Sequence, residues 1–348
     1  MLSIRHHGGV RVIISLANYL REKGHNIYLI TPRDRFNPLY PIKSDVNIIL
    51  TPPVAEFGYV SHILSLFWLY RYIPSSDFIV ANFFPTFFPA YYASKGGKGK
   101  LLYFVQGFEE SFYDGLLKYI SRLTYRMDGT FIVISRWIAK NISRYAHTIK
   151  VIPPGPEEGI FFPEPEPSLL SGKKAPALLF IWRKERKKGI FEYLKALQIL
   201  EDRRADFEAW FIVLEEETLP NISLKKPIKF FTPKSDSELR RLYSSADIFV
   251  SASWIEGFGL PPLEAMACGT PAVLTQSGGV SEFARDGVNS FIVPPKDPIK
   301  LSEAIMTLLK DENLRNKLKE GALSTSKKFS LRKMAEEFEN YLLSIGKG

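Results

Sequence analysis

The chain has 348 residues, of which 45% are hydrophobic and 24% charged, so we expect two globular domains rather than one. Cys268 is the only cysteine, which excludes an intramolecular disulfide framework and fits a reducing compartment such as the cytosol. Residues 1–150 contain 18 Lys/Arg and 9 Asp/Glu, so the whole net charge of +9 lies there. Such a basic part attracts phosphorylated ligands, anionic lipid or nucleic acid, or it serves solubility alone.

The first half of the chain shows an alternating β/α pattern. A helix is expected after residues 8–9 (GG), because apolar residues recur at helical spacing up to Gly24. Short apolar runs then predict strands at 26–31, 78–81, 101–105 and 130–134, with helices at 116–126 and 137–145. This alternation is typical of a parallel sheet with helices on both faces.

Two apolar stretches, 57–70 and 78–94, approach the composition of a membrane span. The first contains His62 and is shorter than the ~20 residues that a spanning helix needs. In the second, Asn82, Pro85 and Pro89 are expected to break any helix. We therefore predict no transmembrane span in either.

A stretch rich in Pro and Glu, 153–167, reads as a linker, after which the alternation restarts. The sequence predicts strands at 177–182, 209–214, 228–231, 247–251 and 271–274, and helices at 189–200, 235–244, 262–267, 301–309 and 331–343. We expect an N-terminal domain over 1–155, a C-terminal domain over 156–328, and a final helix within 329–348 that packs back toward the first domain. Only seven residues precede the glycines at 8–9, so either 1–5 is a stunted strand or the true N-terminus is missing; we favour truncation.

The most informative segment follows the strand at 247–251. Gly257 and Gly259 flank Phe258 in a loop that runs to Leu260, where the backbone can approach a ligand, and Pro261 and Pro262 then start a helix. The free amides and positive end of that helix form an anion site. Glu256 before the helix and Glu264 within it can accept hydrogen bonds from sugar hydroxyls. Taken alone, the two carboxylates also fit a capped helix with glutamates in solvent.

The full string 256–271 (EGFGLPPLEAMACGTP) resembles glycosyltransferase family 4, the retaining GT-B enzymes with an E-x7-E motif. Segments 277–282, 286–289 and 293–297 resemble the same family. The resemblance implies an α/β GT-B fold, with two Rossmann-like doubly wound domains facing a central cleft. It also implies a nucleotide-sugar donor, with Glu256 orienting the sugar and Glu264 holding the ribose.

A run of charged residues, 183–188, lies at the carboxyl end of a predicted strand, where α/β proteins bind ligands. Arg183 and Lys188 match the Arg-x4-Lys pair with which the family clamps the donor diphosphate. Lys184, Arg186 and Lys187 are expected to be surface residues.

The first half matches the family less completely. Gly9 lies in a segment that resembles its glycine loop, and Asn82 stands where many members have histidine. Gln106 and Glu109, in the segment 104–110, are candidate sugar contacts or ordinary loop polarity. Ser135 and Gly155 are expected to be structural.

No metal-ligand pattern is visible, and we expect neither a metal nor another cofactor. Arg183, Lys188 and helix amides would take over charge stabilisation. The resemblance implies front-face attack with retention, and the domains are expected to close about 153–167.

The acceptor is open between a glycan and a lipid-linked hydroxyl. The aromatic string 83–92 either stacks on sugars or fills a core. With the basic first half it permits peripheral contact with an anionic membrane, which would place a cytoplasmic protein at the inner face. The rival readings are a nucleotide-sugar hydrolase or epimerase of the same fold, an inactive fragment, and a basic nucleic-acid- or membrane-binding protein without transferase activity. No nucleic acid is expected, because the specific motifs lie in the neutral half.

Overall fold

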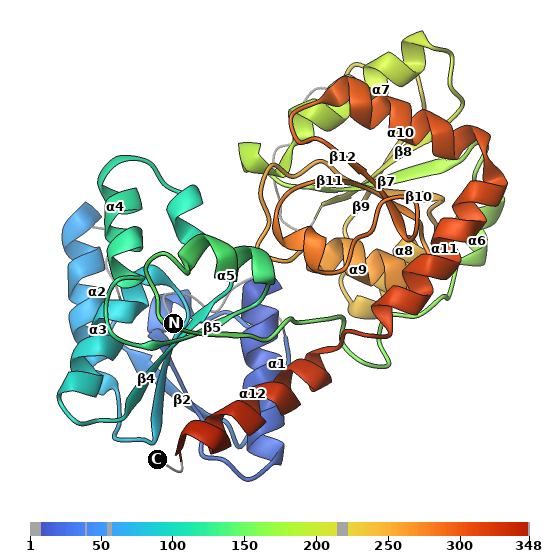
Figure 1. Cartoon of the computed structure of the whole chain (residues 1–348). Helices are drawn as coiled ribbons and strands as arrows, with labels where there is room; N and C mark the ends of the chain where they lie inside the picture. Colours follow the sequence, from blue (N-terminus) through green and yellow to red (C-terminus); the bar gives the residue numbers. More distant parts are fainter. Residues whose placement is uncertain (1–7, 39, 54–57, 214–221, 347–348) are drawn as a thin grey trace. The chain divides into compact units, whose positions relative to one another are not determined.

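The computed structural model describes residues 8–38, 40–53, 58–213 and 222–346, with the side chains of 58–63 left aside. The chain divides into two compact units. The first unit contains residues 1–154 and 331–348, and the second contains residues 155–330 (Figure 1). The segment 1–5, considered above as a stunted first strand, lies outside the described residues.

The strands described in the first unit form two parallel sheets. One pairs β1 (Tyr28–Pro32) with β2 (Asn47–Thr51), and the other runs in the order β3-β4-β5-β6. Its strands are β3 (Phe78–Ala81), β4 (Lys100–Val105), β5 (Thr130–Val133) and β6 (Thr148–Val151). The helices are α1 (Gly8–Glu22), α2 (Gly58–Tyr72), α3 (Phe84–Lys95), α4 (Gly115–Thr124), α5 (Arg136–Ile142) and α12 (Leu331–Gly346).

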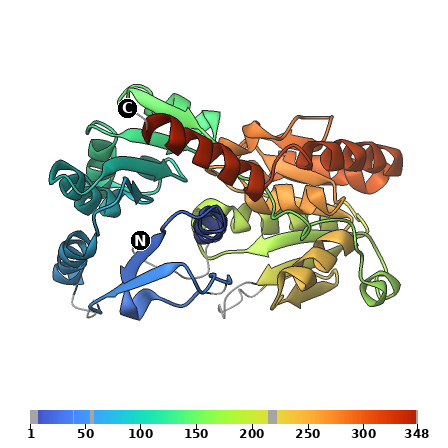
Figure 2. The same cartoon turned by 90° about the horizontal axis from the view of Figure 1, so that it is seen from below.

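Adjacent residues of β4 point to opposite faces of the four-stranded sheet. Tyr103 faces α3, where its ring lies 5.0 Å from that of Phe87. Phe104 faces α12, with its ring 5.6 Å from that of Phe338. The last helix of the chain thus covers one face of the first unit's sheet and also packs on α1 (Figures 1 and 2).

The second unit is built on one six-stranded parallel sheet with the order β12-β11-β10-β7-β8-β9. The strands are β7 (Ala177–Trp182), β8 (Glu208–Val213), β9 (Ile228–Phe231), β10 (Ile248–Ser251), β11 (Ala272–Thr275) and β12 (Ser290–Val293). The helices are α6 (Pro167–Ser171), α7 (Ile190–Asp202), α8 (Asp236–Ser245), α9 (Leu260–Ala267), α10 (Pro298–Lys310) and α11 (Glu312–Ser326). This order is the doubly wound one, in which the chain starts in the middle and winds outward in both directions.

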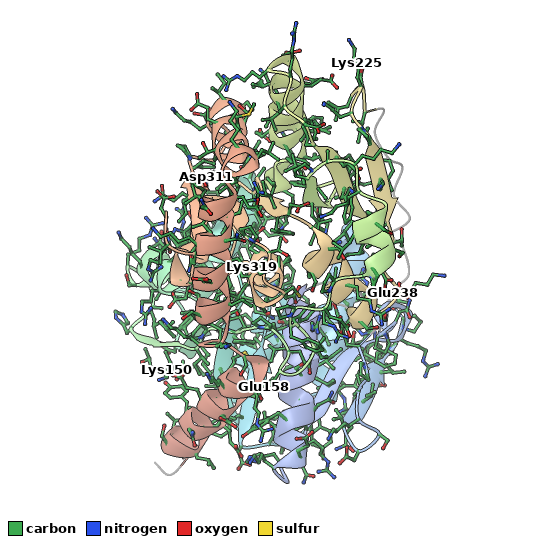
Figure 3. The ribbon with its side chains drawn as sticks, turned by 90° about the vertical axis from the view of Figure 1, so that its right-hand side faces the viewer. Lys150, Glu158, Lys225, Glu238, Asp311 and Lys319 are labelled. Carbon is green, nitrogen blue, oxygen red and sulfur yellow. The ribbon has the colours of Figure 1, made fainter. Side chains whose placement is uncertain are left out.

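Both faces of this sheet are buried. On one face α7 and α10 pack against alternate strand residues, as in the stack of Tyr193 on Phe180 at 4.4 Å between centroids. On the other face lie α8 and α9, with Tyr243 against Phe249. α11 packs against α9 and is preceded by its N-cap residue Asp311, which is labelled in Figure 3. The Asp311 side chain accepts a hydrogen bond from the Leu314 N–H at 2.9 Å.

The structure corrects the expectation that prolines prevent a helix within 78–94. α3 forms there because Pro85 lies in the first turn, where no N–H is needed, and Pro89 removes a single bond one turn later. The aromatic string 83–92 is therefore helical rather than a loop, and Phe84 and Phe87 are buried while Tyr92 is exposed. In the described residues, no helix is both long and apolar enough to cross a bilayer.

Several elements lack a clear sequence signal and were not predicted: β2, α2, β6, β12 and α11. The strand at 26–31 also forms two residues later than expected and pairs with β2 instead of joining the main sheet. The short helix α6 was not predicted either. Elsewhere the ends of the predicted strands and helices agree with the structure to within three residues.

Ser135 is structural, as expected, because its hydroxyl caps the first turn of α5 by accepting from the Ile138 N–H at 3.3 Å. Replacing an N-cap serine by alanine costs about 1 kcal/mol. Ser135→Ala should therefore lower the urea midpoint of unfolding. Ser143→Ala, at the exposed C-terminal end of the same helix, is the control and should leave the midpoint unchanged.

Candidate active site

The topological switch point of the second unit lies between β7 and β10. These strands are parallel neighbours, and the chain leaves β7 toward β8 on one side and β10 toward β11 on the other. Ligands of doubly wound sheets bind in the crevice at the carboxyl ends of such strands. Arg183 directly follows β7, and the segment leading to Glu256 directly follows β10.

The two segments are locked together by a close approach of their backbones. Gly189 has φ +75°, and a Cβ built on it would lie 2.0 Å from the Ala252 carbonyl oxygen. The Trp254 N–H donates to the Lys187 carbonyl at 2.8 Å. Glycine is required at 189 because any side chain would push these backbones apart.

This approach brings Lys188 to Glu256. The Lys188 Nζ lies 2.8 Å from Glu256 Oε1, and the Ser253 hydroxyl donates to the same oxygen at 2.7 Å. The Lys188 side chain is 36% exposed and that of Glu256 is 20% exposed, so the pair lies at a surface. Within the described part of the chain, Glu256 Oε2 receives no hydrogen bond and remains available to a ligand hydroxyl.

The loop that carries Glu256 is tied to the segment after β11. The Glu256 N–H donates to the Ser277 carbonyl at 2.7 Å, and the Gly279 N–H donates back to the Glu256 carbonyl at 2.9 Å. A Cβ on Gly279 would lie 2.0 Å from the Gly257 carbonyl oxygen, so a second glycine permits close packing. Glu256 is thus held from β7, β10 and β11 together.

The remaining residues of the loop shape the start of α9. Phe258 is buried against Phe283 and Phe329, which anchors the loop. Gly259, at φ +100°, turns the chain into the helix, which begins at Leu260, two residues earlier than expected. Because Pro261 and Pro262 have no N–H, the donors at this helix start reduce to the amides of Gly259 and Leu260.

Glu264 occupies a different environment from Glu256. It lies one turn into α9 and is only 6% exposed. The Tyr243 hydroxyl of α8 donates to its Oε2 at 3.3 Å. The two glutamates of the motif therefore lie in different surroundings: Glu256 is partly exposed and ion-paired, and Glu264 is buried between helices.

Three site features were not singled out from the sequence. Ser253 and Gly189 hold Glu256 and Lys188 in place, and Trp254 lies beside cations, with Lys296 Nζ 4.3 Å and Arg186 Cζ 5.5 Å from its ring centroid. In the sequence, the small residues at 251–253 and the glycine that follows the charged run 183–188 could have indicated these positions.

The candidates of the first unit lie at the carboxyl ends of β3 and β4, which are neighbours. Gly9 lies in the first turn of α1 against Gln106, so that a Cβ on Gly9 would be 3.1 Å from Gln106 Oε1. Asn82 follows β3, and its N–H donates to the Thr86 hydroxyl at 3.3 Å. Gly9 and Gln106 are thus brought together, with Asn82 on the adjacent strand.

Glu109 is a core residue rather than an accessible sugar contact. It is 3% exposed, and its carboxyl group accepts a hydrogen bond from the Tyr103 hydroxyl. Burial raises the pKa of Glu109 to about 8, although the hydrogen bonds from Tyr103 and from the Phe84 backbone act in the opposite direction. Gly155 is structural as well, because a Cβ there would lie 2.3 Å from the Ser330 nitrogen.

Among the His, Cys, Asp and Glu side chains of the described residues, no group of three or more is close enough together to hold a metal ion. Arg183, Lys188 and the start of α9 contribute positive charge at the switch point.

Comparison with known families and structures identifies the class. The model of Glycosyltransferase Family 4 matches residues 6–157, and that of Glycosyl transferases group 1 matches 162–325. The fold is that of the GT-B glycosyltransferases: a sucrose-phosphate synthase from Thermosynechococcus elongatus superposes with a TM-score of 0.83 at 17% identity, over 97% of this chain and 94% of its own. HepE from Anabaena, in complex with UDP-glucose, gives 0.78 at 17% identity, over 99% and 98%. The chain belongs to the group 1, family 4 glycosyltransferases.

Sequence relatives agree with this assignment. A D-inositol 3-phosphate glycosyltransferase of Corynebacterium jeikeium is 30% identical over 208 residues, which are 54% of this chain and 50% of the relative. That of Arthrobacter sp. is 27% identical over 64% of this chain and 56% of its own. The chain spans about half the length of the curated relatives it matches.

The close approach at Gly189 generates a prediction. Gly189→Ala should lower the free energy of unfolding by roughly 3 kcal/mol or more, because the Cβ meets a backbone oxygen in a left-handed conformation. Gly287→Ala is the matched control: φ is +67° there, but nothing lies within 4 Å of the added Cβ, so about 1 kcal/mol is expected. Equal losses in urea unfolding would contradict the close approach.

The raised pKa of Glu109 leads to a prediction about how stability depends on pH. Folding raises the pKa of Glu109 from 4.5 to about 8, so the folded protein binds this proton more tightly than the unfolded chain does. The resulting contribution to the free energy of unfolding is fully present below pH 4.5. That stability is lost as pH rises through about 8, at up to about 1.4 kcal/mol per pH unit. Glu109→Gln, which keeps the shape without the titration, should remove this slope from the unfolding free energy between pH 5 and 8, whereas Glu22→Gln on the exposed side of α1 should retain it.

Proposed function

We propose that the protein transfers a sugar from a nucleoside diphosphate to an acceptor hydroxyl, with the donor bound at the switch point of the second unit. The observation that carries this proposal is the Lys188–Glu256 pair, which places a cation and a partly exposed carboxylate side by side where β7 and β10 end. A diphosphate-sugar needs both groups next to each other: a positive charge for the phosphates and an acceptor for sugar hydroxyls.

Each group has a distinct part in the proposed reaction. Glu256 orients the sugar through Oε2, while Ser253 and Lys188 fix the rotamer through Oε1. Arg183, Lys188 and the amides of Gly259 and Leu260 stabilise the charge that develops on the departing diphosphate. Glu264 would hold the ribose hydroxyls, with its carboxylate oriented by Tyr243.

The proposed step is a retaining transfer of a hexose. The bond between the anomeric carbon and the phosphate oxygen breaks, and its electron pair leaves with the nucleoside diphosphate. The acceptor oxygen bonds to the same face of the anomeric carbon, and its proton passes to the leaving phosphate oxygen. The carbon passes through an oxocarbenium-like state, and the step as proposed uses no metal.

The proposed classes of donor and acceptor rest on what similar proteins bind or are named for. HepE was solved with UDP-glucose and with UDP, which supports a nucleoside-diphosphate hexose. The curated relatives are named for an inositol phosphate acceptor, which supports a polyol or glycan hydroxyl, free or lipid-linked. Gly9, Asn82 and Gln106, at one edge of the first unit's sheet, are the proposed contacts for the transferred sugar and the acceptor.

The test is nucleotide release over a panel of UDP-, GDP-, ADP- and dTDP-sugars, with membrane extract and glycans as acceptors. Glu256→Gln and Lys188→Ala should each lower kcat/KM about a hundredfold or more, the scale of losing one polar contact to the transition state. Lys184→Ala, an exposed cation of the same turn, should retain activity.

Product analysis decides between the rival reactions. A new glycoside that appears only with acceptor supports transfer. Free sugar or an epimerised donor, formed equally without acceptor, would replace transfer by hydrolysis or epimerisation. If no nucleotide sugar binds, or if both site variants behave as the parent chain, the proposed donor site is wrong.

A further inference from the structure

Helix α4 has an inverted pattern of burial. Its inward side carries Ser121 and Thr124, both fully buried. Its outward side carries apolar residues, most of all Leu116 (71% exposed) and Tyr119 (57%), and a helix on the surface of a soluble domain normally shows the opposite arrangement. The exposed apolar set, called here the α4 surface, comprises Phe112, Leu116, Leu117, Tyr119 and Leu123.

The inverted helix is held firmly in this orientation. The Ser121 and Thr124 hydroxyls donate to carbonyls of their own helix, at 2.9 and 2.7 Å, so neither requires water. Tyr125, just after the helix, is fully buried and stacks on Tyr103 and Phe108. Arg122 forms an ion pair with the buried carboxylate of Glu110. The helix therefore cannot turn its leucines inward without breaking the core beneath it.

Positive charge surrounds the α4 surface. Arg126 and Arg144 both lie over the Tyr145 ring, with Cζ 5.0 and 4.7 Å from its centroid, and the Arg144 side chain is 59% exposed. Lys118 lies within the helix, which contains no acidic residue.

The nearby carboxylates offset only part of this charge. Glu110 is buried and is shared by Arg122 and by Arg144, whose guanidinium lies 3.8 Å from it, so one carboxylate faces two cations. Asp128 pairs with Lys95, which leaves exposed Asp114 at the N-cap as the acid beside the surface. A rigid apolar face with a basic rim matches the interface of an anionic bilayer, where leucines enter the acyl boundary and cations meet lipid phosphates.

We propose that the α4 surface is a membrane-docking site for anionic lipid. It differs from the aromatic string 83–92, since α3 buries much of that string. A second copy of the chain is a poorer occupant, because a symmetric contact would bring the basic rims together. The inference concerns where the protein binds and does not depend on the proposed transfer reaction.

Vesicle sedimentation of the full chain tests the proposal without any donor. The chain should sediment with vesicles of phosphatidylcholine mixed with phosphatidylglycerol, and less with phosphatidylcholine alone. Leu116→Ser with Leu117→Ser should weaken binding about tenfold or more, through lost apolar burial. The matched control is Phe191→Ser with Ile299→Ser, two residues of the second unit that are 65% and 53% exposed; it should bind as the parent chain.

A charge variant separates the two contributions. Lys118→Gln with Arg126→Gln should weaken binding to anionic vesicles about fivefold per charge and leave binding to neutral vesicles unchanged. Circular dichroism of each variant checks that the fold is retained. The proposal is overturned if the parent chain does not sediment with anionic vesicles, if the α4 leucine variant binds equally well, or if that variant instead abolishes a dimer of the parent chain.

Discussion

The contact between the backbones at Gly189 and Ala252 is the constraint on which the candidate site depends. In the described residues β8, β9, α7 and α8 lie between β7 and β10 in sequence, yet β7 and β10 are neighbours in the sheet. The left-handed glycine after η3 (Arg186–Lys188) lets the end of β7 turn directly against the end of β10. Lys188 and Glu256 meet because this turn is tight, and the Trp254–Lys187 backbone bond keeps it so.

The two carboxylate oxygens of Glu256 have different surroundings. Oε1 is held by a cation and a hydroxyl, while the backbone on either side is bonded to the segment after β11. Such support fixes the direction of Oε2 before any ligand arrives. A carboxylate held in this way loses little conformational freedom on binding, which is how a rigid scaffold aids recognition.

How far the sequence predicts this protein depends on whether a signal is local. The strand, sharp loop and helix around 247–267 are marked by an apolar run, two glycines and two prolines, so fold class and motif could be read directly. The ion pair between Lys188 and Glu256 could not, since it joins residues 68 positions apart through a sheet order that no local pattern encodes. The same holds for β2 and β12, short edge strands whose pairing supplies the missing signal. α3 was missed for another reason: tertiary packing of Phe84 and Phe87 outweighs a proline in the interior of the helix.

The segment between β4 and β5 breaks the usual rule of apolar inside and polar outside on both sides. Its interior takes two glutamates, Ser121 and Thr124, and its exterior takes leucines and aromatic rings. The Tyr103 hydroxyl donates to the Glu109 carboxyl group and Arg122 pairs with Glu110, and burial in this interior is what raises the pKa of Glu109. Local departures of this kind weaken a fold unless something else requires them, and they concentrate at functional positions. Because Ser121 and Thr124 occupy the inward side of α4, its leucines and tyrosine must face outward. The arrangement that places polar groups in the core of the first unit therefore also creates the α4 surface that we assign to lipid.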